Sequence, residues 1–95
     1  MYSLARVTAK FFATVREITG VRSAEFEAKN ITELLKVLSK TYPRFSETVL
    51  KDDTMELKQF FSCMVNGKRI ELLDGYNTIL KDNDAVALFP PVGGG

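Results

Sequence analysis

The chain has 95 residues, 45% of them hydrophobic and 26% charged, which suits one globular domain with a modest core and excludes a disordered chain. Its net charge is +1 and its basic residues are scattered, so a charged patch that binds nucleic acid or a membrane surface is not expected. One cysteine and no histidine exclude an internal disulfide, a histidine-based catalytic dyad or triad, and a Cys/His zinc site.

Two alternating segments open the sequence. Apolar and polar side chains take turns through residues 6–12 and again through residues 21–28, which is the period of a half-buried strand. Residues 13–20 connect the two segments and close with Gly20. A short connection between two strands predicts a hairpin.

A helical period follows over residues 31–42. Asn30, with Glu33 three residues later, has the pattern of a capping box. One apolar stripe runs along the predicted helix and is formed by Ile31, Leu34, Leu35, Leu38 and Tyr42. Pro43 ends the helix, because the residue before a proline disfavours helical dihedral angles.

The second half of the chain predicts three strands and little helix. Residues 44–58 are polar and have no sustained period, and we expect one helical turn there, near residues 46–50. The strands are expected at residues 60–66, 69–72 and 85–89. Turns are expected at Asn66-Gly67, at Asp74-Gly75 and at residues 82–84.

This order of elements predicts an α+β domain over residues 1–89. Two hairpin-like pairs around one helix give a mixed sheet of about five strands, with the helix packed on one face of the sheet. That is the β-grasp, or ubiquitin-like, arrangement, in which the first and last strands lie side by side. Residues 90–95 then form a flexible tail outside the domain.

The tail has the composition of a reactive carboxyl terminus. Pro90 and Pro91 end the last strand and stiffen the chain that leaves it. Gly93, Gly94 and Gly95 carry no side chains, so this end fits a narrow channel in a partner. The carboxylate of Gly95 is ionised at neutral pH and is a competent nucleophile toward an activated phosphate. A partner that holds ATP can convert it to an acyl-adenylate; the alternative is an inert, frayed terminus.

Longer motifs resemble one known family. Residues 11–20 (FFATVREITG), 65–67 (VNG) and 80–92 (LKDNDAVALFPPV), followed by glycines, resemble the small subunit of molybdopterin synthase, in the same order. That family is a ubiquitin-like sulfur carrier with a β-grasp fold. The chain differs at Gly93, where the familiar tail has a side chain, and at residues 51–58, which are longer than in the shortest members and suggest an elongated, archaeal-type branch.

The resemblance implies a carrier and not an enzyme. Gly95 would be adenylated by a ubiquitin-activating-type adenylyltransferase, which uses the ATP, and converted to a thiocarboxylate. The thiocarboxylate would enter the large subunit of molybdopterin synthase and donate sulfur to the dithiolene of molybdopterin, for a molybdenum or tungsten cofactor. No cofactor or metal is expected on the chain itself.

Three other functions remain open from the sequence. The first is a ubiquitin-like modifier that is conjugated to lysine through Gly95, after the same activation. The second is a sulfur carrier for thiamine, which is disfavoured because that family is shorter and lacks the proline pair. The third is a β-grasp interaction domain with an inert tail.

An exposed apolar patch is expected beside the tail. Phe12 and Phe89 both fall in the polar phase of their strands, so in adjacent strands the two rings would share an exposed surface, with Met64 as a possible third member. The alternative is that each ring folds over a sheet edge and is simply half-buried. The resemblance implies that Phe89 contacts both partners, and the predicted partner-binding residues of the tail are Pro90, Pro91 and Val92.

The remaining candidate residues favour structural roles. Cys63 shares a phase with apolar neighbours and is expected in the core. The carboxylates at residues 52–53 and 82–84 do not match a calcium loop and are expected to accept turn hydrogen bonds. A lone cysteine and the absence of a secretory-signal pattern over residues 1–6 make the cytoplasm the expected location.

Overall fold

The computed structural model describes residues 4–91 of the chain. Its strands are β1 (Ala5–Phe11), β2 (Ser23–Ala28), β3 (Ser62–Val65), β4 (Lys68–Arg69) and β5 (Ala85–Phe89). Its α-helices are α1 (Thr14–Thr19), α2 (Ile31–Thr41) and α3 (Phe45–Val49). Two short 3₁₀ helices, η1 (Ile70–Leu72) and η2 (Gly75–Asn77), lie between β4 and β5.

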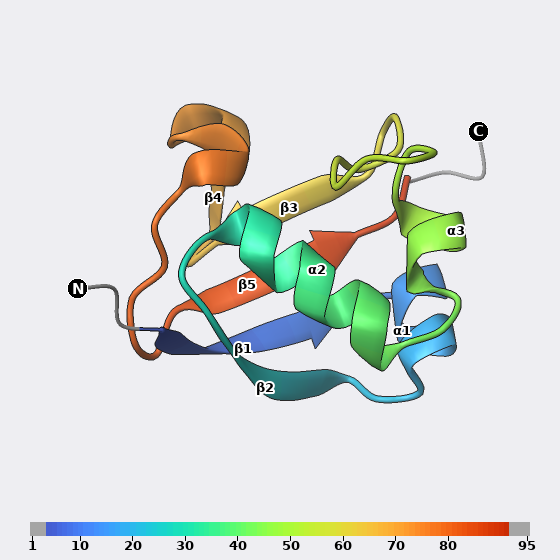
Figure 1. The fold of residues 1–95 in the computed structure, drawn as a ribbon, viewed down its shortest axis with the longest axis horizontal. Coiled ribbons are helices and arrows are strands. Elements are labelled where there is room, and N and C mark those ends of the chain that lie inside the picture. Colours follow the sequence, from blue (N-terminus) through green and yellow to red (C-terminus); the bar gives the residue numbers. More distant parts are fainter. Residues whose placement is uncertain (1–3, 92–95) are drawn as a thin grey trace.

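The five strands form one mixed sheet with the spatial order β2-β1-β5-β3-β4. The first and last strands, β1 and β5, are parallel neighbours at its centre, while the other pairs are antiparallel (Figure 1). The β-grasp fold expected from the sequence is therefore confirmed. The last strand is a central one, so the chain leaves the domain from the middle of the sheet.

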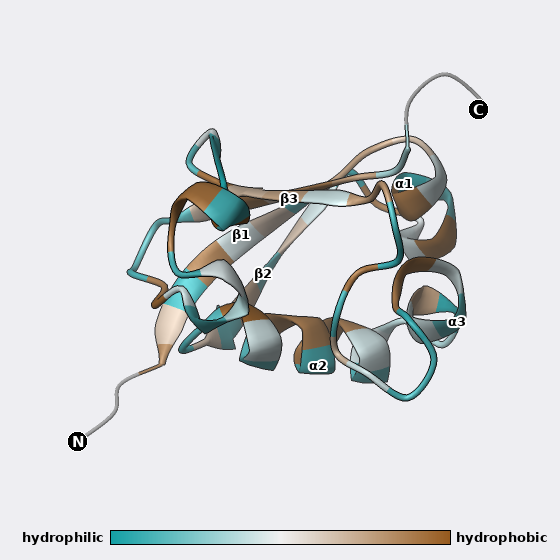
Figure 2. Cartoon of the chain, turned by 90° about the horizontal axis from the view of Figure 1, so that it is seen from above, coloured by the Kyte–Doolittle hydropathy of each residue, from teal (hydrophilic) through white to brown (hydrophobic). Residues whose placement is uncertain are grey.

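Helix α2 forms a second layer on one face of the sheet (Figure 2). Figure 2 shows α2 beneath the strands, with its apolar side turned toward them. The predicted cap is present, because the Asn30 side chain accepts a hydrogen bond of 2.8 Å from the backbone N–H of Glu33. The stripe is confirmed as well: Tyr42 packs partly buried against the core, and the fully buried members are Ile31, Leu34, Leu35 and Leu38.

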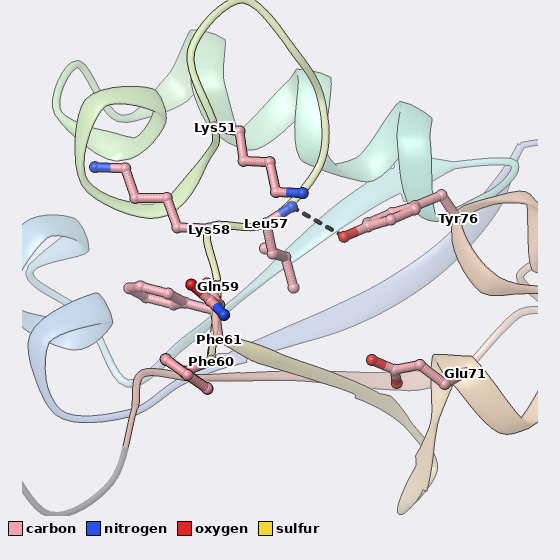
Figure 3. A pocket seen from close by; sticks show the side chains of 8 residues that line it. All are labelled: Lys51, Leu57, Lys58, Gln59, Phe60, Phe61, Glu71 and Tyr76. Carbon is pink, nitrogen blue, oxygen red and sulfur yellow. Dashed lines mark hydrogen bonds between the residues drawn. The ribbon is translucent and has the colours of Figure 1, made fainter. Parts of the chain in front are cut away.

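Residues 44–58, where the sequence has no sustained period, form α3 and a long loop. The predicted helical turn is there, and Leu50 and Leu57 bridge the ends of the loop and bury their side chains. The Tyr76 hydroxyl accepts a hydrogen bond of 2.9 Å from the backbone N–H of Leu57, which ties this loop to η2 (Figure 3). Burial is the main cause that raises the pKa of the Tyr76 phenol above its ordinary value.

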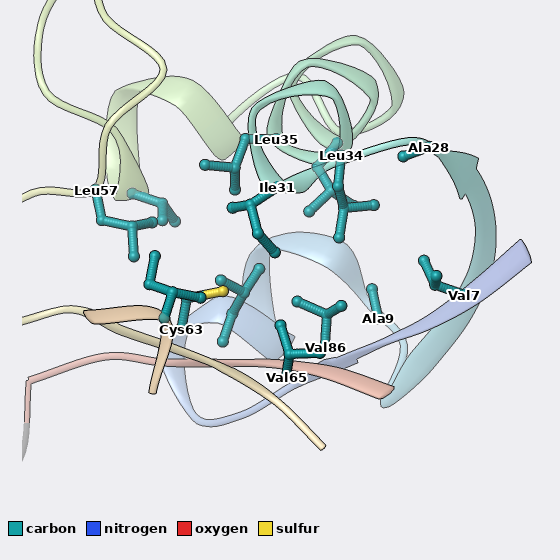
Figure 4. Packing of buried hydrophobic residues seen from close by; sticks show 14 of the residues in the cluster. Val7, Ala9, Ala28, Ile31, Leu34, Leu35, Leu57, Cys63, Val65 and Val86 are labelled. Atoms are coloured by element: carbon teal, nitrogen blue, oxygen red, sulfur yellow. The ribbon is translucent and has the colours of Figure 1, made fainter. Parts of the chain in front are cut away.

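One core fills the space between the helices and the sheet (Figure 4). The inward phase of β1 is buried throughout, as the alternation predicts, and it meets Val86 and Leu88 of β5 across the parallel pair. Cys63 of β3 lies in the same core. Burial, with a smaller contribution from Glu71, raises the pKa of its thiol to about 12, so Cys63 is the apolar residue expected from its phase and not a nucleophile.

Three expected elements differ from the structure. The connection over residues 13–20 contains α1, which ends at Gly20 in the left-handed conformation. The strand expected at residues 60–66 begins only at Ser62, because Phe60 has a φ of 71° and cannot continue a ladder. The strand expected at residues 69–72 is wrong beyond Arg69: the chain turns into η1, which buries Ile70 in the core.

The expected turns are present. Asn66 and Gly67 both have positive φ, at 52° and 84°, as a two-residue hairpin loop requires. The side chain of Asp84 accepts hydrogen bonds from Asn66 Nδ2 and the backbone N–H of Lys81, each at 2.8 Å. The aspartates of this turn therefore serve as turn acceptors, as expected. Among residues 4–91, no group of histidine, cysteine and acidic side chains is arranged to hold a metal ion.

Candidate functional site

The candidate site lies where the chain leaves the sheet. Leu88 of β5 pairs in register with Phe11 of β1, so the two parallel strands end together and at the same edge. The next residue of each segment is aromatic: Phe12 directly follows β1, and Phe89 is the last residue of β5. Sequence-distant segments are thus brought together by the sheet alone.

The two rings form a stacked pair. Their centroids are 4.5 Å apart and their planes differ by 12°, and each residue is half-buried. Offset stacking of two aromatic rings contributes about 0.5–1.5 kcal/mol beyond the area it buries. The juxtaposition expected from neighbouring strands is therefore present, and the half-burial of both rings fits the exposed patch and the alternative equally. That the pair binds a partner stays a prediction.

Met64 lies on the same outer face of the sheet. It pairs with Ala87 of β5, while Ser62 pairs with Phe89, so Met64 is the diagonal neighbour of the Phe89 ring and is half-buried. Ala85 and Ala87 of β5 lie on the same outer face. Of the predicted tail residues, Pro90 is half-buried and Pro91 exposed, and residues 92–95, with Val92, Gly93, Gly94 and Gly95, lie outside the described part of the chain.

Two strained residues flank this end of the sheet, and the sequence analysis missed both. Ala13, next to Phe12, has φ 51° and ψ −123°, a conformation that suits glycine. Phe60, just before β3, has a φ of 71° and is 73% exposed. Strained backbone of this kind costs about 1–3 kcal/mol per residue and concentrates at functional sites. Nothing in the local sequence marks either position as a turn.

A hollow of about 390 Å³ lies beside Phe60 at the start of β3 (Figure 3). Leu57 and Tyr76 form part of its wall, and the hydrogen bond between them already occupies their polar atoms. Its charged side chains have partners: Lys51 and Glu71 pair at the surface with Glu56 and Arg69, and Lys58 Nζ donates to the carbonyl of Glu47.

No helix within residues 4–91 has the length and apolarity needed to cross a membrane. The distinctive feature of the described residues is the aromatic pair at the base of the tail.

Comparison with known proteins gives the same outline. Small archaeal modifier protein 3 of Haloferax volcanii is 35% identical over 89 residues, which is 90% of this chain and 95% of that protein. The solution structure of small archaeal modifier protein 1 from Methanosarcina acetivorans has a TM-score of 0.86 and 30% identity, covering 99% of this chain and all of that one. A Pyrococcus furiosus protein provisionally named molybdopterin converting factor, subunit 1, has a TM-score of 0.72 and 27% identity over 93% of this chain and 99% of its own.

Residues 9–95 match the ThiS family, so nearly the whole described domain and the glycine tail are covered. The stacked ring pair, the proline pair and the terminal glycines all fall within the matched range. The chain therefore belongs to the ThiS family and has the fold of its ubiquitin-like sulfur carriers.

Proposed function

We propose that this protein is a sulfur carrier whose reacting group is the carboxylate of Gly95. The observation that carries the proposal is the position of the tail. It leaves from a central strand, next to a stacked aromatic pair, through two prolines and into a run of glycines. The prolines stiffen the chain where it leaves the domain. The glycines have no side chains and keep the reacting end narrow. In this proposal the catalytic groups belong to partner proteins, and the carrier supplies the atom that reacts.

Activation takes place in two steps. A carboxylate oxygen of Gly95 attacks the α-phosphorus of ATP held by an adenylyltransferase of the ubiquitin-activating type, and pyrophosphate leaves. Hydrosulfide, or an equivalent sulfur nucleophile, then attacks the acyl carbon, and AMP leaves with the bonding electron pair. The products are a thiocarboxylate on Gly95, AMP, pyrophosphate and the proton of the hydrosulfide, which passes to solvent. The carrier contributes no proton acceptor, in keeping with its lack of histidine.

For the acceptor, we propose the pterin precursor of molybdopterin. The thiocarboxylate would enter the large subunit of molybdopterin synthase and give up its sulfur to the dithiolene. Support comes from the sequence motifs at residues 11–20 and 80–92 and from the similarity to the Pyrococcus furiosus protein named as molybdopterin converting factor, subunit 1. Once the sulfur has bonded to the precursor, water would cleave the acyl–sulfur bond and regenerate the Gly95 carboxylate, and two such transfers would supply the two sulfurs of the dithiolene.

A second function has its own support. The Haloferax volcanii relative is named a modifier protein and matches over 90% of this chain. A lysine amine that attacks the same acyl-adenylate would give an isopeptide bond to Gly95 and release AMP. The two functions share their activation and differ only in the nucleophile that follows.

One reconstitution separates them from each other and from an inert tail. The purified chain is incubated with the adenylyltransferase, ATP, sulfide, the synthase large subunit and the sulfur-free pterin precursor, and the dithiolene product is measured. We expect product with the full chain and none after deletion of Gly94 and Gly95. Equal product from the shortened chain would refute the carrier. Lysine peptides bearing the Gly95 remnant in the native host, without dithiolene product in vitro, would favour the modifier.

A further inference from the structure

A second surface lies beside the aromatic pair and is basic. A pocket of about 230 Å³ brings together Lys10 from β1, Arg16 from α1 and Arg22 from the connection into β2. Phe12 forms its apolar wall, and Ser23 and Phe11 complete the lining. The basic residues are scattered in the sequence, but the fold gathers three of them at one place. We call these three side chains and the Phe12 wall the basic pocket.

Within the described residues, the three cations of the basic pocket have no ionic partner. Each is exposed, and within residues 4–91 none of them forms an ion pair or a side-chain hydrogen bond. Most other basic residues differ: Arg6 and Arg69, for example, pair with Glu25 and Glu71. The pocket lining contains no carboxylate. A concentration of unpaired positive charge of this kind attracts an anionic partner.

The backbone fixes where these cations stand. Lys10 pairs with Ser23 across β1 and β2, and the N–H of Phe11 donates a hydrogen bond of 2.8 Å to the carbonyl of Arg22. The strained Ala13 then turns the chain from β1 directly into α1, which carries Arg16 back toward the pocket. Lys10 and Arg16 therefore come from regular elements joined by one sharp turn, and Arg22, directly before β2, is held beside them by its backbone hydrogen bond to Phe11.

Phe12 connects this pocket to the end of the chain. The same ring is the wall of the basic pocket and half of the stacked pair with Phe89. A partner that covers the pair in order to receive the tail therefore meets the basic pocket next. We propose that the basic pocket binds an acidic segment, rich in aspartate and glutamate, of the protein that receives the carboxyl end. This inference names a partner feature and rests on the proposed carrier function.

Charge favours a protein segment over a nucleic acid. The chain has a net charge of only +1, and the three cations occupy one pocket and no extended stripe, whereas a nucleic-acid backbone requires many phosphate contacts along its length. A free phosphate is disfavoured because all three cations are exposed and no buried donor faces the pocket. Carboxylates spaced along a chain, with an apolar side chain for Phe12, match both parts of the surface.

The test uses the full chain and two matched variants. One replaces Lys10, Arg16 and Arg22 with glutamine. The control replaces Lys40, Lys68 and Lys81 with glutamine, which changes the net charge equally at exposed cations that do not line the basic pocket. A synthetic peptide rich in glutamate and aspartate is titrated into each protein, and amide chemical shifts are followed by NMR. Inorganic phosphate and a single-stranded oligonucleotide are titrated in the same way.

We expect peptide-dependent shifts around residues 10–23 in the wild type and the control, and their loss in the pocket variant. With the adenylyltransferase, the pocket variant should show a KM raised about tenfold at low salt with kcat retained. The inference is overturned if the peptide changes the amide chemical shifts of other residues instead. It is overturned as well if the changes around residues 10–23 persist in the pocket variant. It is also overturned if phosphate or the oligonucleotide saturates the pocket at lower concentration than the peptide. Peptide binding at the pocket without any adenylation of the wild type would instead refute the proposed function and leave the pocket assignment standing.

Discussion

The stacked pair of Phe12 and Phe89 is the residue-scale feature from which partner binding can be tested. Replacing Phe89 with aspartate removes the stack, which contributes about 0.5–1.5 kcal/mol beyond the area that the ring buries, and leaves the half-buried position charged. If the pair is a binding anchor, affinity for the activating enzyme should fall by more than about tenfold. Isothermal titration calorimetry measures that affinity directly.

Leu72 provides the matched control for this substitution. It is 76% exposed and lies in η1, beyond the far edge of the sheet, so Leu72→Asp introduces the same charge away from the tail. This variant should bind as the wild type does. Equal affinities for Phe89→Asp and wild type would show that the aromatic pair is only a packing contact.

For single residues, the sequence predicted which face of a strand a side chain occupies, but it did not predict where the backbone is strained. Alternation placed Phe12 and Phe89 on the outer side of neighbouring strands, and the structure brings their rings together. Ala13 and Phe60 carry no local signal for positive φ, because tertiary packing imposes it on side chains that disfavour it. The basic pocket was likewise invisible, since its three cations meet only through the β1–β2 register and the turn into α1.

Among the elements, α2 has the sharpest local determinant, the cap at Asn30. Substitution by alanine removes the 2.8 Å hydrogen bond to the Glu33 N–H and should lower the free energy of unfolding by about 1 kcal/mol. Asn30→Ser should restore most of it. Arg44→Ala, at the start of α3 where no side-chain cap exists, should change stability by no more than about 0.5 kcal/mol. Urea unfolding compares them, and a serine variant as unstable as the alanine variant would contradict the cap.

Element boundaries were predictable where the local chemistry is decisive. The Asn30 cap and Pro43 bounded α2, and the proline pair bounded β5 at Phe89, as the structure has them. The errors fall where burial outweighs local pattern. Residues 70–72 alternate as a strand would, but Ile70 gains more from the core than from a ladder at the sheet edge, and the chain coils to bury it.

For the whole molecule, the pKa shifts predict that the free energy of unfolding falls at alkaline pH. With no histidine, few groups titrate between pH 6 and 8, and stability should be nearly level there. Burial raises the pKa of the Cys63 thiol from 9.0 to about 12 and raises those of Tyr42 and Tyr76. Between pH 9 and about 12 the unfolded chain has therefore lost protons that the folded chain keeps, so stability falls as pH rises.

Urea unfolding at a series of pH values measures this fall. Cys63→Ala should be less stable at neutral pH, because it leaves a small cavity in the core, yet lose less of its stability between pH 9 and 11. A wild-type stability that stays level to pH 11 would contradict the burial of all three groups. An unchanged slope in the Cys63→Ala variant would assign the dependence to the tyrosines.

The proposed function of the whole molecule depends on the chemistry of Gly95. The most direct measurement is the intact mass of the full chain after incubation with the activating enzyme, ATP and sulfide, with fragmentation to locate any change. We predict a mass increase equal to the replacement of one oxygen by one sulfur, located at Gly95. A mass that does not change, or a change located at any other residue, would contradict the account.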